Sequence, residues 1–172
     1  MHQVILVSGP PASGKSTLAE PLALALGFAL LSKDTIKEAL FDALQGPAGD
    51  AAYSKRLSDV AMDVLFALAA RCPRVVLDAN FKPQDPHQRE RLAALEGTMV
   101  EVHCRCDPEI AMRRYAERAD TRHPAHALKE LTPELIARHD RPTGFGAAIE
   151  VDTGGPVDVP ALLRRLSQAL TR

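Results

Sequence analysis

The chain has 172 residues, of which 46% are hydrophobic and 25% are charged, and its net charge is -1. This length and composition are typical of about one globular domain with a substantial buried core, and they exclude a disordered or fibrous protein. A nearly neutral chain has no global positive field to draw nucleic acid, so nucleic-acid binding is disfavoured, although a local basic site remains compatible with it.

Short apolar runs alternate with longer amphipathic ones along the chain, a pattern typical of a parallel sheet covered by helices. Apolar or alternating runs predict five strands: Val4–Val7, Phe28–Leu31, Val75–Leu77, Met99–Cys104 and Ala147–Val151. Helical spacing and capping residues predict seven helices: Lys15–Leu26, Lys33–Leu44, Ala51–Ala70, Pro86–Leu95, Pro108–Arg118, Pro133–His139 and Val159–Leu170. We expect a single α/β domain over residues 1–172, with three layers.

A polar stretch near Thr121–Pro133 interrupts this alternation and contains two prolines and two histidines, His123 and His126. We expect an exposed flap here, and we assign a small lid to about residues 119–132. No role for the two histidines follows from the sequence.

The segment from Gly9 to Ser16 matches GxxxxGK[ST] in full, after a predicted strand and before a predicted helix. Glycines let backbone N–H groups turn toward phosphates, and the helix directs its positive end to the same place. Lys15 would neutralise the outer phosphates and the Ser16 hydroxyl would ligate Mg²⁺. We therefore expect these residues to bind ATP: Gly9, Pro10, Pro11, Ala12, Ser13, Gly14, Lys15, Ser16 and Thr17.

Asp78 ends the predicted strand Val75–Leu77, where a Walker-B-type acid would lie. Its carboxylate could hold Mg²⁺ together with Ser16, or it could orient the acceptor. An acid that merely ends a strand is the alternative.

Together with the phosphate loop, three further segments resemble the P-loop kinases: Lys33-Asp34, Asp78-Ala79-Asn80 and the arginine-rich stretch Arg113–Arg122. The branch of the P-loop kinases that this chain resembles most contains AAA-type and zeta-toxin-like kinases, polynucleotide kinases and chloramphenicol phosphotransferases. The resemblance extends over the order of elements in the whole chain, although only the phosphate loop is highly specific. It implies a five-stranded parallel sheet in the order 2-3-1-4-5 and an arginine-bearing lid.

The resemblance also implies roles for residues on the acceptor side of the site. Asp34 matches the aspartate that accepts the proton of the acceptor hydroxyl, although capping of the following helix is an alternative use. Asn80 matches a residue that helps to hold the acceptor or the metal. From their charge alone, Lys33 and Lys37 could flank an anionic acceptor, and solvated lysines are the alternative.

Three arginines match those of the lid, namely Arg114 and Arg118, one helical turn apart, and Arg122. Guanidinium groups suit the oxygens of a transferring phosphoryl group, whereas a solvated basic helix face is the alternative. Gly155 and Pro156 follow the fifth predicted strand, where the resemblance implies a loop beside adenine, and a plain turn is the alternative.

We therefore expect a kinase that transfers the γ-phosphoryl group of ATP, with Mg²⁺, to a small-molecule or nucleotide-like acceptor. A zeta-like toxin or polynucleotide 5′-kinase is one alternative, and an ATPase or nucleotide-binding module is another. Phe41 and Tyr53, on helices expected to form the acceptor pocket, suggest an acceptor with an apolar part or simple packing. The sparse cysteines and the lack of a leader or membrane span predict a cytoplasmic protein.

Overall fold

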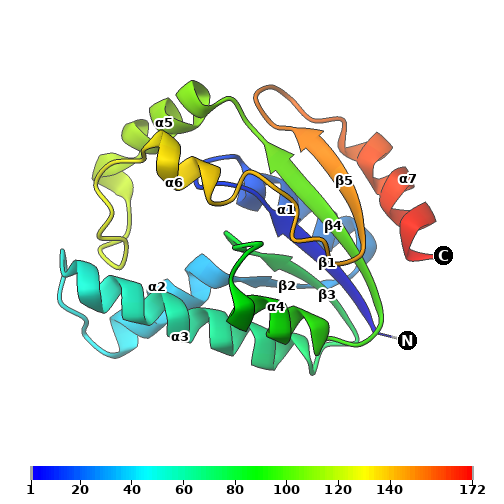
Figure 1. Cartoon of the computed structure of the whole chain (residues 1–172), viewed down its shortest axis with the longest axis horizontal. Coiled ribbons are helices and arrows are strands. Elements are labelled where there is room, and N and C mark those ends of the chain that lie inside the picture. The colour runs from blue at the N-terminus through cyan, green and yellow to red at the C-terminus, as the bar shows by residue number, and fades with distance from the viewer. Residues whose placement is uncertain (1, 172) are drawn as a thin grey trace.

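The sheet is parallel throughout and has the strand order β2-β3-β1-β4-β5 (Figure 1). The structure, a computed structural model, describes residues 2–171. Its strands are β1 (Gln3–Ser8), β2 (Ala29–Ser32), β3 (Arg74–Asp78), β4 (Thr98–Arg105) and β5 (Ala147–Asp152). This order confirms the three-layer fold expected from the sequence.

The helices lie on both faces of the sheet. They are α1 (Lys15–Leu26), α2 (Lys33–Ala43), α3 (Ala51–Ala69), α4 (Pro86–Ala93), α5 (Pro108–Glu117), α6 (Pro133–Ala137) and α7 (Val159–Leu170), with a 3-10 turn, η1, at Ala119–Thr121. Each predicted element is present, with ends that differ from the prediction by at most two residues. None of the helices in residues 2–171 is long and apolar enough to cross a membrane.

Two apolar cores lie between the sheet and the helices, one on each face of the sheet. They form because alternate residues of a buried strand point to opposite faces. On one face, α1 and α7 pack against Ile5 and Val7 of β1. On the other face, α3 and α4 pack against Val4 and Leu6 of the same strand. These four side chains of β1 are at most 1% exposed, so the strand that leads into the phosphate loop is buried on both faces.

Acidic and hydroxyl side chains fix where several helices begin. Asp107 accepts a hydrogen bond from the amide of Glu109, and Thr132 accepts one from Leu135, so both act as the N-caps that the sequence predicts. Asp34 differs, because α2 already begins at Lys33 and Ser32 is its N-cap. The capping alternative for Asp34 is therefore wrong, and its carboxylate is free for another use.

Candidate functional site

The phosphate loop connects β1 to α1 and has the backbone geometry that its glycines permit. Gly9 has φ +135°, and a Cβ atom added there would lie 2.4 Å from the carbonyl oxygen of Cys104. Gly14 has φ +85° and is the N-cap of α1 without any side chain to cap the first turn. The first amides of α1 are therefore available to an anion at the cavity that Gly14, Lys15 and Ser16 line.

Lys15, Ser16 and Asp78 form the charged centre of this loop. The Lys15 ammonium donates a hydrogen bond to the carbonyl oxygen of Pro10 at 2.6 Å, and the Ser16 hydroxyl donates one to Asp78 Oδ2 at 2.7 Å. Burial lowers the pKa of Lys15 and raises that of Asp78, although the two charges and the Ser16 hydrogen bond partly oppose these shifts. Buried charges of this kind are stabilised when phosphate and a cation bind beside them.

A magnesium ion would fit the Ser16–Asp78 pair. A hydroxyl and a carboxylate within hydrogen-bonding distance are hard oxygen ligands, which Mg²⁺ prefers. The Ser32 hydroxyl also donates to Asp78 Oδ2, at 3.3 Å, so the carboxylate is held in one orientation at the end of β3. The buried position of Asp78, 4% exposed, favours a site role over an acid that merely ends a strand.

Asp34 faces the same cavity from the first turn of α2. Lys33 Nζ lies 2.7 Å from its Oδ1 atom, and 49% of the Asp34 side chain remains exposed. Burial of the carboxyl opposes ionisation, but the Lys33 charge outweighs it and keeps the pKa of Asp34 below its usual range. Asp34 is therefore ionised at neutral pH and can accept a hydrogen bond from a hydroxyl group in the cavity.

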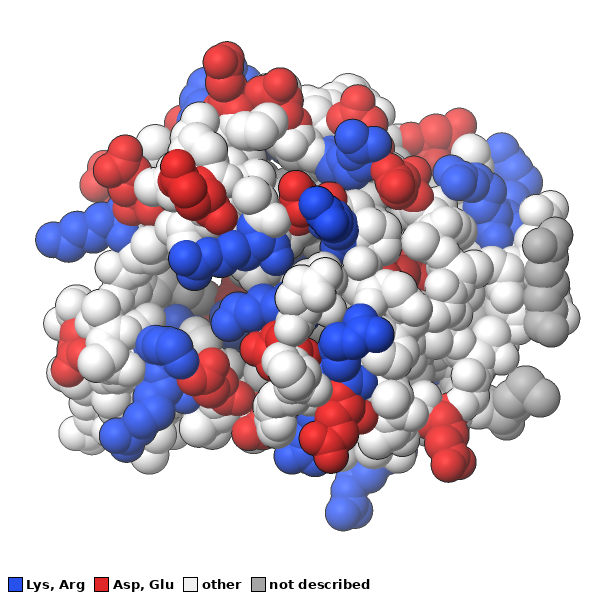
Figure 2. Space-filling model, viewed as in Figure 1, with Lys and Arg blue, Asp and Glu red and all other residues white. Residues whose placement is uncertain are grey.

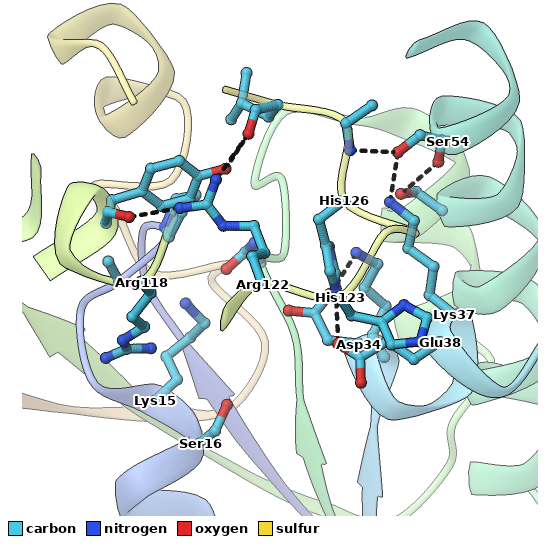
Figure 3. A pocket seen from close by; sticks show the side chains of 18 of the residues that line it. Lys15, Ser16, Asp34, Lys37, Glu38, Ser54, Arg118, Arg122, His123 and His126 are labelled. Carbon is cyan, nitrogen blue, oxygen red and sulfur yellow. Dashed lines mark hydrogen bonds and ion pairs between the residues drawn. The ribbon is translucent and has the colours of Figure 1, made fainter. Parts of the chain in front are cut away.

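The three predicted lid arginines lie in different surroundings. Arg118 is exposed at the end of α5 and its guanidinium forms no hydrogen bond or ion pair within residues 2–171; Figure 3 shows it close to Lys15. Arg122 is held in place, since it donates to the carbonyl oxygens of Leu128 and Tyr115 and lies 3.7 Å from the centre of the Tyr115 ring. Both arginines line the cavity.

Arg114 holds the loop after β5 against the phosphate loop instead. Its guanidinium donates to the carbonyl oxygens of Thr153, at 2.9 Å, and Gly154, at 3.1 Å. It also lies 4.0 Å from where a Cβ atom of Gly14 would be, so it is close to the phosphate loop although it does not line the cavity.

Gly155 and Pro156 are exposed and do not line the cavity, so the structure brings only the first part of their loop beside the phosphate loop. Their expected contact with adenine stays a prediction.

A cavity of about 830 Å³ connects these groups (Figure 3). Lys15, Ser16 and Arg118 lie at one end, which we call the phosphate end. The other end, which we call the acceptor end, is lined by side chains of α2, α3 and the segment 119–132: Lys33, Asp34, Lys37, Glu38, Ser54, His123 and His126. Asn80, just after β3, also lines the cavity, as expected of a residue that contacts the acceptor.

The segment 119–132 reaches across the cavity and contacts α2 and α3. His126 Nε2 lies 2.8 Å from Glu38 Oε1, and His123 Nε2 lies 3.2 Å from Asp42 Oδ1. The hydroxyl of Ser54 donates to the carbonyl oxygen of Ala125 at 2.7 Å. In Figure 1 this segment descends from α5 toward α2 and α3, and several of its side chains line the cavity.

The apolar residues expected at the acceptor pocket have another role. Phe41 and Leu57 are buried with Ala125 in a small core, and Tyr53 packs against them with its ring 6.2 Å from that of Phe41. Neither Phe41 nor Tyr53 lines the cavity. The suggestion of an acceptor with an apolar part is therefore not supported, and packing is the role that the contacts show.

These features define the class of the protein: a P-loop kinase-like fold with a phosphate loop, an oxygen-ligand pair and a basic cavity at the carboxyl ends of the strands. The chain belongs to the AAA domain family, whose sequence profile matches residues 4–142. Among curated proteins, no sequence matches the chain significantly.

Several solved structures with similar folds are described as kinases. A presumed kinase from Chloroflexus aurantiacus J-10-fl is 28% identical, with a TM-score of 0.85 over 98% of each chain. A gluconokinase from Sinorhizobium meliloti 1021 is 17% identical, with a TM-score of 0.59 over 99% of this chain and 92% of its own. A shikimate kinase from Bacteroides thetaiotaomicron is 15% identical, with a TM-score of 0.63 over 99% of each chain. The last two similarities support the fold alone.

Sequence reasoning did not find Glu38 and Ser54 as cavity residues, and it gave His123 and His126 no role. It considered Lys37, with Lys33, as a lysine that could flank an anionic acceptor, and the structure places Lys37 in the lining of the cavity. Lys37 is three residues after Asp34 and therefore lies on the same face of the helix. The contacts of Ser54 depend on how α3 packs against the segment 119–132, and no local pattern encodes that packing.

Proposed function

We propose that this protein is an ATP-dependent kinase that transfers the γ-phosphoryl group to a hydroxyl group of a small-molecule or nucleotide-like acceptor. One observation carries the proposal: a single cavity joins a phosphate loop to an ionised carboxylate, Asp34, on its opposite side. A nucleotide-binding module has no need for such a carboxylate, whereas phosphoryl transfer to a hydroxyl does.

In this reaction, the acceptor oxygen attacks the γ-phosphorus while the bond to the β,γ-bridging oxygen breaks. Asp34 would hold the acceptor hydroxyl and receive its proton as attack proceeds. Lys15 and Arg118 would stabilise the charge on the phosphoryl oxygens. Mg²⁺ bound by Ser16 and Asp78 would neutralise charge on the β- and γ-phosphates.

The segment 119–132 would act as the lid, because its contacts with α2 and α3 close the cavity over the reacting groups. Arg122 would fix the lid to α5 through Tyr115, and it faces the cavity as a second cation. Arg114 would position the loop at Thr153 and Gly154 beside the phosphate loop. Lys33 and Asn80 would contact the acceptor next to Asp34.

The experiment that tests this proposal measures Mg²⁺-dependent ATP consumption with a panel of acceptors: nucleosides, nucleotides, sugars, hydroxy acids and 5′-hydroxyl oligonucleotides. Asp34→Asn is compared with the parent, and Asp63→Asn is the matched control, since Asp63 lies on α3 outside the cavity and pairs with His87 and Arg91. We expect one class of acceptor to stimulate turnover and Asp34→Asn to lower it by about 10²–10⁴-fold, while ATP still binds. If no acceptor matters and Asp34→Asn hydrolyses ATP like the parent, the protein is an ATPase or a binding module.

A further inference from the structure

The acceptor end of the cavity contains a buried lysine whose charge no carboxylate neutralises. We propose that the acceptor is a small hydroxylated anion, whose carboxylate or phosphate group binds Lys37 while its hydroxyl group meets Asp34. This inference deepens the proposed function, since it specifies the chemical class of the molecule that the kinase would phosphorylate.

Lys37 is 3% exposed and lines the cavity from α2. Its ammonium donates one hydrogen bond, at 2.8 Å, to the hydroxyl of Ser54, which is a neutral partner. An ammonium has three donors, and burial of a charge without an opposite charge is unfavourable. An anion in the cavity would supply both the missing acceptors and the missing charge.

The carboxylates near Lys37 already have other partners. Asp34 pairs with Lys33 at 2.7 Å, and Glu38 pairs with His126 at 2.8 Å. The hydroxyl of Ser54 also has other hydrogen-bond partners, since it donates to the carbonyl oxygen of Ala125 and accepts from the amide of Ala127. Within residues 2–171, Lys37 is therefore the buried cation of the acceptor end that has no ion-pair partner.

The cavity is lined by more positively charged than negatively charged side chains. Among the described residues that line it, seven are Lys or Arg and only two are Asp or Glu, in a chain of net charge -1. Figure 2 shows Lys and Arg side chains around the hollow between the α5 side and the α2–α3 side of the molecule. ATP would neutralise Lys15 and the arginines at the phosphate end, but Lys37 belongs to the acceptor end.

The spacing on α2 limits the size of the acceptor. Asp34 and Lys37 are three residues apart, so they occupy one face of the helix with Cβ atoms about 5–6 Å from each other. A molecule that reaches both side chains would have its hydroxyl and its anionic group separated by only a few carbon atoms. Burial lowers the pKa of Lys37 to about 8, with Lys33 adding to the shift, so the ammonium remains protonated at pH 7.

The test measures binding rather than turnover. Titration calorimetry at pH 7, with the full chain saturated with Mg²⁺-ADP, compares pairs of an anionic and a neutral molecule: gluconate with sorbitol, shikimate with its methyl ester, and ribose 5-phosphate with ribose. The first two pairs test a carboxylate and the third tests a phosphate. Lys37→Met removes the charge at similar volume. Lys82→Met is the control, because Lys82 is the exposed lysine on the loop after β3 and lies outside the cavity.

We expect the anionic member of at least one pair to bind about tenfold or more tightly than its neutral partner. This preference should disappear in Lys37→Met and persist in Lys82→Met. The inference is overturned if neutral members bind equally well, if Lys37→Met keeps the preference, or if no member of any pair binds.

The two proposals can fail separately. An anion preference that depends on Lys37, without phosphoryl transfer to any acceptor, would leave the anion site and remove the kinase assignment. Phosphoryl transfer to a neutral acceptor, unaffected by Lys37→Met, would leave the kinase assignment and remove the anion site.

Discussion

The two ends of the cavity are built in different ways. Apart from Arg118, the phosphate end comes from one continuous segment, in which backbone conformation at Gly9 and Gly14 shapes the site that follows the buried strand β1. The acceptor end comes from α2, α3 and the segment 119–132, and it depends on side-chain pairs such as His126 with Glu38. A substitution at the phosphate end should therefore affect catalysis directly. At the acceptor end, substitutions other than that of Asp34, which would receive the acceptor proton, should mainly affect acceptor binding.

The difference also explains what each end can recognise. Backbone amides and a helix N-terminus bind any phosphate chain, because they present the same dipoles whatever the rest of the sequence is. Pairs of charged side chains can be changed one at a time, so the acceptor end can be altered for a new molecule without disturbing the nucleotide site.

After Asp34→Asn, the largest effect is expected at the phosphate end, from Lys15→Met. Lys15 lies at the first turn of α1, and no other lysine at that end of the cavity could replace its charge on the phosphoryl oxygens. Loss of one such stabilising group lowers kcat by about 10²–10³-fold. Steady-state ATP consumption measures this, and Lys82→Met is the control. A variant that retains half of the parental kcat would contradict the role of Lys15.

The next largest effect on kcat should distinguish Arg118 from Arg122. Arg118→Ala should lower kcat by about 10²-fold, because the Arg118 guanidinium has no partner in the described chain and is free to contact the phosphoryl group. Arg122→Ala should lower kcat by only about tenfold, through loss of its contacts with Tyr115 and Leu128.

Arg113→Ala is the control for this pair, since Arg113 is an exposed arginine of α5 that pairs with Glu117. Single-turnover measurements with saturating ATP would isolate the transfer step. A larger loss in Arg122→Ala than in Arg118→Ala would reverse the assignment.

The two ends of the cavity also differ in how far the sequence could predict them. The strand order and the phosphate loop were predicted because both follow from local patterns: apolar runs of a buried parallel sheet, and glycines that permit one backbone path. A shared role of Ser16 and Asp78 in metal binding was also predicted, because Asp78 ends a strand and Ser16 belongs to the phosphate loop motif. The structure brings the two side chains within hydrogen-bonding distance.

The acceptor end could not be predicted in the same way. Lys37, Ser54 and Ala125 are linked by hydrogen bonds between residues 17 and 71 positions apart, and these depend on tertiary packing. Phe41 and Tyr53 were interpreted as possible pocket residues because an apolar helix face has the same pattern whether it contacts a ligand or another helix.

A smaller effect is expected from pH on the binding of an anionic acceptor. The pKa of Lys37 is lowered to about 8 by burial and by Lys33, while Asp34 and Glu38 oppose the shift and Ser54 of α3 accepts its hydrogen bond. The ammonium is therefore present below about pH 8 and is lost as the pH rises through that value. The KM of an anionic acceptor should be about tenfold higher at pH 9 than at pH 7.

Lys37→Arg provides the test of this dependence, because a guanidinium stays charged throughout the range. The rise in KM between pH 7 and pH 9 should be absent in this variant, even if its affinity at pH 7 is lower. A rise of equal size in the parent and in Lys37→Arg would show that another group is responsible.

The smallest effect is expected where the segment 119–132 meets α2. His126→Ala removes the contact with Glu38, which is partly exposed, and such pairs contribute about 0.2–1 kcal/mol. We expect the acceptor KM to rise by at most about fivefold, while kcat changes by less than about twofold, because the contact holds the lid and does not touch the phosphoryl group. His126→Gln, whose amide can still donate to Glu38, should restore most of the affinity.

His87→Ala is a matched control, since His87 Nε2 also lies 2.8 Å from a carboxylate, that of Asp63, but joins α4 to α3 outside the cavity. It should leave the acceptor KM unchanged, so a rise specific to His126→Ala assigns the effect to the lid. An equal rise in both variants would mean that general loosening of α3 is the cause. A fall in kcat larger than the rise in KM would instead place His126 next to the reacting atoms.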